Sequence, residues 1–286
     1  MSWVKASCPA SCGELFQCTD GQKEYLLSYG IDRGSWVDIG SIGTFEWDLP
    51  EKMTRALRER FPSMSMPMSY GRTVPVGKGY SSSTADLVAC LQAVSVTIGE
   101  PLTAEQLTRW CAEIEPTDSV AFADWTVIDP LTGEVIYQTN WKPKLFVYVL
   151  EPEQLIETIS LPRMTIDSAY PWKDSINLLE VFKQACQLQD VQLLGQVASQ
   201  SALLNNQRLP KPYLPELLEL AKGHAALGVN VAHSGSVVGI LLTKEALPNL
   251  PRLEQALKDG PIGDYYGKRY LAQLCYEGVT WRKECE

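Results

Sequence analysis

The sequence contains only two histidines and no apolar run long enough to cross a membrane, and both shortages restrict its function. Its densest apolar segment, KLFVYVL at 144–150, has the length of a strand, whereas a membrane helix needs about 18 apolar residues or more. The N-terminal segment MSWVKASCPAS lacks the apolar core of a signal peptide. We therefore expect a cytoplasmic protein that does not associate with a membrane.

Clustered basic residues are also missing. The formal net charge is −9, and no run of lysine and arginine occurs anywhere in the chain. Because affinity for a nucleic-acid backbone depends on such clusters, we expect no nucleic-acid partner. A small anionic ligand is compatible with this charge, because backbone N–H groups and one local cation can hold it.

The two histidines and eight cysteines argue against further classes. His224 falls in a helical pattern, and His233 lies next to a serine on a strand-like run, where neighbouring side chains point in opposite directions. No G-x-S-x-G motif occurs, so serine-hydrolase chemistry is not expected. No cysteine pair has C-x-x-C spacing, and the group Cys8, Cys12 and Cys18 fits no zinc pattern, so the cysteines are predicted to be reduced thiols.

Hydrophobic patterning predicts an α+β protein of two lobes, residues 1–143 and 144–286. The N-terminal lobe begins with a strand, a turn and a second strand, and contains a Met- and Pro-rich loop at 62–71. A hairpin is predicted around Asp129–Gly133, and strands at 144–150 and on both sides of 232–236. Helices are predicted at 51–60, over about 15 residues that end before Gly99, and at 103–114, 174–188, 190–205, 213–226 and 250–259.

The segment PVGKGYSSSTAD, residues 75–86, has the composition of a phosphate-binding loop. It is not the common P-loop, because Lys78 lies between Gly77 and Gly79 instead of preceding a serine or threonine. A glycine-rich loop that enters a helix presents backbone N–H groups at the positive end of the helix dipole, and the hydroxyls of residues 81–84 can bind phosphate or Mg²⁺. The alternative is a turn whose helix is capped by one of the serines.

Two further segments carry candidate chemistry. EIEPTDS, residues 113–119, contains Glu113, Glu115 and Asp118, which could bind Mg²⁺ or orient an attacking hydroxyl. The alternative is a solvated helix end in which Asp118 forms an Asx-turn. AHSGSVVGIL, residues 232–241, places Ser-Gly-Ser between two strand-like runs, either as an ordinary hairpin or as a second loop that approaches a nucleotide from the other lobe.

These segments resemble the motifs of the GHMP kinases, a family that includes galactokinase and the homoserine, mevalonate and phosphomevalonate kinases. PVGKGYSSSTA is similar to their phosphate-binding motif, AHSGSVVGI to their C-terminal glycine motif, and ASCPASCGELFQ stands in the place of their N-terminal motif. The variants CPASCGEL, EIEPTDS and NVAHSGS most resemble the L-threonine kinases of the propanediol-utilisation type.

The resemblance implies a two-lobed fold, with an N-terminal lobe like that of a small-subunit ribosomal protein and a ferredoxin-like C-terminal lobe. It implies transfer of phosphate from ATP, with Mg²⁺, to L-threonine, giving O-phospho-L-threonine for adenosylcobalamin synthesis. A kinase of homoserine or another amino alcohol, and a nucleotide sensor without activity, are the alternatives, and a homodimer stays open. The residues expected at ATP are Pro75, Gly77, Lys78, Gly79, Tyr80, Ser81, Ser82, Ser83, Thr84, Ser234, Gly235 and Ser236.

The resemblance also assigns roles at the reacting atoms. Asp118 corresponds to the base or orienting residue, and Glu14 and Asp118 are expected at the substrate. Ser83 is expected at Mg²⁺ together with either Glu115 or Glu113. Candidates for the clamp on the substrate carboxylate are Arg33 and Arg72.

The chain departs from the family pattern at two places. Ala10 and Ser11 stand where the family has a basic residue after Pro-Gly, so the catalytic cation would be Lys78 or Lys5. Ser81 replaces a usual glycine.

Overall fold

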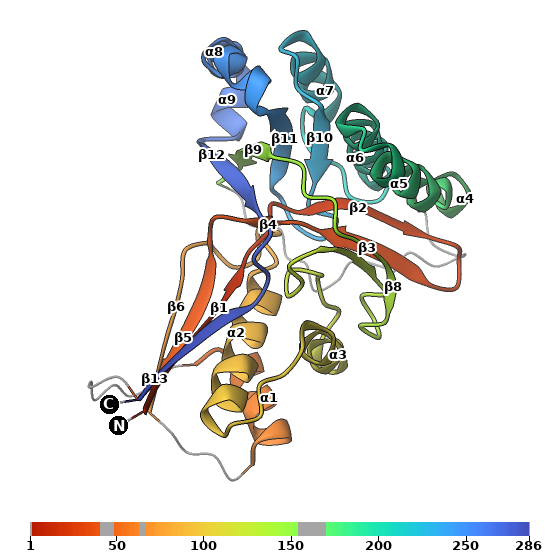
Figure 1. The fold of residues 1–286 in the computed structure, drawn as a ribbon. Coiled ribbons are helices and arrows are strands. Elements are labelled where there is room, and N and C mark those ends of the chain that lie inside the picture. The colour runs from red at the N-terminus through yellow and green to blue at the C-terminus, as the bar shows by residue number, and fades with distance from the viewer. Residues whose placement is uncertain (1, 41–48, 63–66, 154–169, 286) are drawn as a thin grey trace.

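The computed structural model describes residues 2–40, 49–62, 67–153 and 170–285. These residues form a four-stranded and a nine-stranded sheet with helices packed on both, which confirms the predicted α+β class. Figure 1 shows the small sheet beside α1, α2 and α3 in the lower part of the molecule, and the large sheet beside α4–α9 in the upper part. Residues 63–66 of the predicted Met- and Pro-rich loop lie outside the described residues.

The small sheet joins the beginning of the chain to its end. Its order is β13-β1-β5-β6, and all neighbours are antiparallel. Val4, Ala6 and Cys8 of β1 are buried and alternate with more exposed residues, and Ala6 and Cys8 pack into a core with α2. The last part of the predicted loop at 62–71 is instead an edge strand, β6. The strands are β1 (Ser2–Pro9), β5 (Gly34–Ile39), β6 (Met68–Arg72) and β13 (Thr280–Cys285).

Helix α2 (Ser82–Thr97) lies between the small sheet and two other helices, α1 (Glu51–Arg60) and α3 (Ala104–Ile114). Nearly all of its residues are buried, as expected of a core helix. The predicted helices at 51–60 and 103–114 are confirmed, and Thr103 forms a capping box with Gln106 at the start of α3. The burial of α2 fixes its N-terminus at the end of the glycine-rich loop.

The large sheet has the order β4-β12-β9-β11-β10-β2-β3-β7-β8. It contains strands from both sides of the predicted lobe boundary at 143/144, and that boundary stays a prediction. The two halves meet in this sheet at two places: Glu14 of β2 pairs with Val231 of β10, and β4 pairs with β12. The strands are β2 (Glu14–Thr19), β3 (Glu24–Ser28), β4 (Gly30–Ile31), β7 (Trp125–Ile128), β8 (Val135–Thr139), β9 (Leu145–Glu151), β10 (Gly228–Val231), β11 (Val238–Thr243) and β12 (Lys268–Cys275).

Helices from the second half of the chain cover the large sheet. Helix α6 packs on β2 and β10, so it spans one of the places where the two halves meet, and α7 packs on β10 beside it (Figure 1). The predicted helices in this half are confirmed with small shifts of their ends. The predicted helix at 174–188 is divided into α4 (Trp172–Ser175) and α5 (Asn177–Leu188), and the others are α6 (Val191–Asn206), α7 (Leu214–Gly223) and α8 (Leu250–Lys258). Two short helices were not predicted, α9 (Pro261–Tyr265) and the 3₁₀ helix η2 (Lys244–Asn249).

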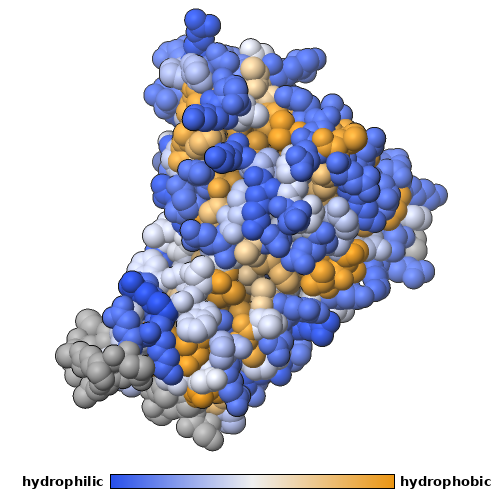
Figure 2. All heavy atoms as spheres, in the orientation of Figure 1, coloured by the Kyte–Doolittle hydropathy of each residue, from blue (hydrophilic) through white to orange (hydrophobic). Residues whose placement is uncertain are grey.

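The surface in Figure 2 is hydrophilic over much of its area, and hydrophobic residues are exposed in separate patches. The exposed large hydrophobic residues come from several different elements, as is normal for a folded protein. Among the described residues, no helix combines the length and the apolar character that crossing a membrane requires.

Candidate functional site

The loop between β6 and α2 contains residues in left-handed backbone conformation. Gly77 and Gly79 have φ values of 73° and 92°, and Ser81 has a φ of 54°. This conformation suits glycine, which has no Cβ, whereas it costs a serine about 1–2 kcal/mol. The serine that replaces the family's glycine therefore occupies a position whose backbone geometry favours glycine.

The first turn of α2 presents backbone N–H groups without a side-chain cap. Ser81 is the N-cap residue but makes no capping hydrogen bond, and its Oγ lies 2.5 Å from Ser11 Oγ. The alternative of a turn capped by a serine is therefore wrong at Ser81. The N–H groups of Ser82 and Ser83 stand at the positive end of a 16-residue helix, where an anion is stabilised.

The two glycine-rich segments pack directly against each other. A Cβ on Gly79 would lie 2.2 Å from Ala232 Cβ, and one on Gly235 would lie 2.4 Å from Gly79 Cα. The backbone N–H of Ser236 donates to the carbonyl of Lys78 at 2.9 Å. Only glycines allow this approach, which brings the loop at 75–81 and the loop at 233–236 together.

Side chains of these loops differ in their surroundings. Ser236 Oγ is buried and has no hydrogen-bond partner among the described residues, whereas Ser234 is exposed. Tyr80 is buried in the core, and its hydroxyl donates to Glu151 Oε2 at 2.6 Å. Pro75 is partly exposed on the loop. A buried hydroxyl without a partner is compatible with a ligand that supplies one.

The Lys78 side chain reaches the segment after β9. Lys78 is 6% exposed, and its Nζ donates to the carbonyls of Pro152 and Glu153, with 2.9 Å to Glu153. These contacts tie the glycine loop to the start of the second lobe. Contact of Lys78 with phosphate stays a prediction.

Asp118 lies beside the first turn of α2. Its Oδ1 accepts a hydrogen bond from Ser28 Oγ at 2.9 Å, and its Oδ2 accepts one from Thr84 Oγ1 at 3.3 Å. Burial raises the pKa of Asp118 to about 7, the negative charge of Glu14 adds to the rise, and hydrogen bonds from Ser28, Ser81 and Thr84 oppose it. A carboxyl group with a pKa near 7 can accept a proton at neutral pH, so Asp118 is suited to be a general base.

Glu14 is held by a histidine that follows β10. Its Oε2 accepts a hydrogen bond from the His233 backbone N–H at 2.7 Å and lies 3.2 Å from His233 Nδ1. On the other side of the ring, Nε2 lies 3.0 Å from Ser201 Oγ of α6. Burial lowers the pKa of His233, so the ring is neutral near pH 7. His233 therefore orients Glu14 and is not paired with its neighbour Ser234.

Two cations near Glu14 come from the segment between α6 and α7. Arg208 Nη2 donates to the carbonyl of His233 at 2.7 Å. Lys211 is 3% exposed, and its Nζ donates to the carbonyl of Leu209 at 3.3 Å. Burial lowers the pKa of Lys211 to about 7, the charge of Glu14 opposes this, and that of Arg208 adds to it. Glu14 and Lys211 thus place a buried negative group and a buried positive group within electrostatic reach of each other, an arrangement that suits a zwitterionic ligand.

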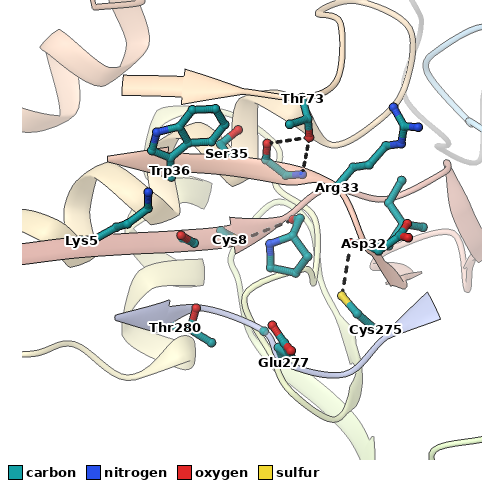
Figure 3. Close-up of a pocket in the computed structure, with 15 residues that line it drawn as sticks. Lys5, Cys8, Asp32, Arg33, Ser35, Trp36, Thr73, Cys275, Glu277 and Thr280 are labelled. Carbon is teal, nitrogen blue, oxygen red and sulfur yellow. Dashed lines mark hydrogen bonds between the residues drawn. The ribbon is translucent and has the colours of Figure 1, made fainter. Parts of the chain in front are cut away.

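A cavity of 580 Å³ lies on the face of the small sheet opposite α2. Figure 3 shows it between Lys5 and Trp36 on one side and Asp32 and Arg33 on the other, with Cys275 below. Lys5 Nζ lies 3.4 Å from Asp38 Oδ2 and 5.5 Å from the centre of the Trp36 ring. This face does not carry the serine run.

The two arginines that the sequence offered for the substrate carboxylate lie elsewhere. Arg33 lines the cavity of Figure 3, and Arg72 pairs with Asp86 at 2.8 Å. Neither contacts Asp118 or Glu14 among the described residues. The charge of Glu14 instead acts on Lys211, and Arg208 acts on both Lys211 and His233; the sequence patterns revealed neither cation.

Ser83 and Glu115 form a pair of oxygen ligands between three helices. The Ser83 hydroxyl donates to Glu115 Oε1, and Lys52 of α1 forms an ion pair with Glu115 Oε2 while its Nζ lies 3.3 Å from Ser83 Oγ. Glu113 instead pairs with Arg60 and is 61% exposed. The structure thus brings Glu115, and not Glu113, to Ser83.

These residues fit a magnesium ion. Hydroxyl and carboxylate oxygens are the ligands that Mg²⁺ takes, and an ammonium group already occupies the place beside them. No group of three or more acidic, histidine or cysteine side chains suited to a metal occurs in the part of the chain that the structure describes. The remaining ligands would therefore be phosphate oxygens and water, as is usual for Mg²⁺.

A cavity of 530 Å³ adjoins this pair between α1, α2 and β6. Its lining includes Lys52, Val76 of the glycine loop and Ser83. Its floor is polar, because buried Asp86 accepts hydrogen bonds from Tyr70 and Arg72, each at 2.8 Å. The volume is sufficient for a small-molecule ligand beside the serine run.

Sequence comparison agrees with this geometry. Residues 48–125 match the GHMP kinases N terminal domain, and residues 182–252 match the GHMP kinases C terminal domain. The chain therefore belongs to the GHMP kinase family.

Its relatives include L-threonine kinases. The chain is 32% identical to the L-threonine kinase of Salmonella typhimurium, over 96% of this chain and 94% of that protein. It is 34% identical to the L-threonine kinase of Citrobacter freundii, over 96% of this chain and 98% of that protein. The structure of Lactococcus lactis galactokinase complexed with galactose superposes with a TM-score of 0.71 at 12% identity, covering 98% of this chain and 95% of that one, and shows the shared fold.

Proposed function

We propose that the protein is an ATP-dependent kinase that phosphorylates the side-chain hydroxyl of L-threonine. The similarity to L-threonine kinases over nearly the whole chain supports this substrate. The observation that carries the chemistry is Asp118, a carboxylate with a raised pKa that lies beside the uncapped first turn of α2. A base at the end of a phosphate-binding loop can accept the proton of a hydroxyl that attacks a phosphate.

The phosphates of ATP would lie on the loop at 75–84 and the adjoining loop at 233–236. The backbone N–H groups of Ser82 and Ser83 and the buried hydroxyl of Ser236 supply hydrogen bonds, and the helix dipole favours the negative charge. The nucleoside would occupy the cavity of 530 Å³ between α1 and α2. Ser83 and Glu115 would hold Mg²⁺, which neutralises the charge on the phosphates when bound.

The amino-acid part of threonine would be recognised by opposite charges. Glu14 is oriented by His233 and would bind the ammonium group. Lys211, with Arg208 beside it, would bind the carboxylate. Both ends of a zwitterion would then be fixed, which places its hydroxyl relative to Asp118 and reduces the entropy cost of reaction.

The proton of the hydroxyl would pass to Asp118. Hydrogen bonds from Ser28 and Thr84 fix the carboxylate, and the nearby charge of Glu14 makes it a better base. Phosphate transfer then depends on positioning and on charge neutralisation by the loop and Mg²⁺, because the chain forms no covalent intermediate in such a transfer.

The deciding experiment measures ADP release with L-threonine, L-serine, L-homoserine and mevalonate as acceptors, and identifies the product by phosphorus NMR. We expect L-threonine to give the highest kcat/KM and a phosphate monoester as product. A preference for L-homoserine would overturn the threonine assignment, and no release above the acceptor-free rate with any alcohol would overturn the kinase. A cytoplasmic location, a homodimer and a contribution to adenosylcobalamin synthesis stay predictions from the sequence.

A further inference from the structure

Three helix ends converge on one carboxylate. Lys52 lies in the first turn of α1, Ser83 in the first turn of α2, and Glu115 directly follows α3. Lys52 Nζ pairs with Glu115 Oε2 and lies 3.3 Å from Ser83 Oγ, and the Ser83 hydroxyl donates to Glu115 Oε1. An ammonium group thus stands against the same two oxygen-bearing side chains that fit a divalent cation.

The ammonium group compensates for an unfavourable position of the carboxylate. Glu115 follows the C-terminal end of α3, where the helix dipole disfavours negative charge, and its side chain is 17% exposed. The Lys52 side chain is 53% exposed and belongs to a helix end at the surface. Such a half-exposed ion pair is weak, and moving the lysine costs little, so a divalent cation can take its place.

We propose that Lys52 is an exchangeable cation: a divalent ion displaces it from Ser83 and Glu115, and the released ammonium group binds the phosphates of the nucleotide. This inference rests on the proposed function for the nature of the ligand, a nucleoside triphosphate. Lys52 lines the same cavity as Ser83 and Val76 of the glycine loop, so its side chain is already at the phosphate end of that cavity. One lysine therefore serves both states: it neutralises Glu115 in the free protein and the phosphates in the complex.

The arrangement predicts effects of opposite sign on two ligands. In Lys52→Met, the competitor of the divalent ion is gone, so Mn²⁺ alone, as a paramagnetic probe, binds about two- to fivefold more tightly than to the unchanged protein. In the same variant a non-hydrolysable ATP analogue with saturating Mg²⁺ binds about two- to fivefold more weakly, because a phosphate contact is lost. Free Mn²⁺ is measured by electron paramagnetic resonance, and analogue binding by calorimetry.

Arg55→Met is the matched control. Arg55 lies one turn further along α1, pairs with Glu59 and is equally exposed, so both affinities are expected to stay unchanged. A double-mutant cycle with Glu115→Gln isolates the interaction: in that background Lys52→Met no longer tightens Mn²⁺ binding. Thermal unfolding of each variant verifies the fold, and Lys52→Gln is a second variant for the same measurements.

Either of two results would overturn the proposal. Equal or weaker Mn²⁺ binding by Lys52→Met would show that the lysine does not compete with the metal. Unchanged affinity for the Mg²⁺-loaded analogue would show that the released ammonium group does not reach the phosphates. Both measurements are independent of turnover, so a lack of ADP release with every acceptor would refute the proposed function and leave the test of the exchange intact.

Discussion

The charge of Lys211 gives the most informative test of the proposed substrate site. Burial lowers the pKa of Lys211 to about 7, although Glu14 nearby raises it. Because only the protonated lysine attracts a carboxylate, kcat/KM for L-threonine is predicted to fall as the pH rises above 7. At pH 8.5, a lysine with a pKa of about 7 is only about 3% protonated, so kcat/KM is expected to be about thirtyfold below its fully protonated value.

A Lys211→Arg variant removes this titration without removing the charge. A guanidinium group stays protonated at every pH of the assay, so the decrease above pH 7 should disappear even if the variant is less active overall. The increase from acid pH should remain, because it arises from deprotonation of Asp118, whose pKa burial raises to about 7. The unchanged protein should therefore show a narrow maximum near pH 7, and the variant a rise to a plateau.

The assay couples ADP release to NADH oxidation between pH 5.5 and 8.5, a range in which the ammonium group of threonine stays largely protonated, at threonine concentrations well below KM and with coupling enzymes in excess. Lys222→Arg on α7 is the control: Lys222 is exposed to solvent, so this variant should leave the pH profile unchanged. An identical decrease above pH 7 in Lys211→Arg would show that another group titrates. A flat profile between pH 7 and 8.5 in the unchanged protein would refute the assignment of the carboxylate to Lys211.

Three further predictions concern the loops, the base and the metal. Asp118→Asn should keep its affinity for ATP, measured by calorimetry, and lower turnover about 10²- to 10⁴-fold; near-normal turnover would remove Asp118 from its role. Gly235→Ala should weaken ATP binding and lower the free energy of unfolding by about 1–3 kcal/mol in denaturant titrations, because its Cβ would lie 2.4 Å from Gly79 Cα in the facing loop. Gly223→Ala should have neither effect, because its Cβ would have no atom within 4 Å. Glu115→Gln should weaken Mn²⁺ binding in paramagnetic resonance and Glu113→Gln should not, and the reverse result would reassign the metal ligand.

Local sequence patterns predicted the parts of the site that one segment supplies alone. The glycine loop, the helix after it and the Ser-Gly-Ser segment each have a pattern whose physical meaning is local, and the structure has these elements in the expected places. Local patterns could not decide whether Glu113 or Glu115 is the metal ligand. Helix α3 ends at Ile114, and Glu115 is extended, with φ of −160° and ψ of 161°, which turns it toward Ser83 while Glu113 stays on the helix surface.

The rest of the site could not be predicted because its residues come from distant segments. Ser28 and Asp118 are separated by 90 positions, and Ser201 contacts His233 across 32. Lys211 lies in a stretch of prolines and polar residues without a periodic pattern, so nothing in its neighbours shows that the fold buries it. Contacts of this kind depend on tertiary packing and not on local propensity.

The pairing of β13 with β1 also determines when the N-terminal sheet can be completed during synthesis. Residues 2–7 of β1 pair on one side with residues 280–285 of β13, and residues 4–9 pair on the other side with residues 34–39 of β5. Until β13 has left the ribosome, this side of β1 is an open edge with unpaired backbone groups, the kind of surface that promotes association between nascent chains. The sheet that supports the phosphate loop is therefore finished only after β13 has been synthesised, so the folding of the nucleotide site is coupled through this strand to synthesis of the second half of the sequence.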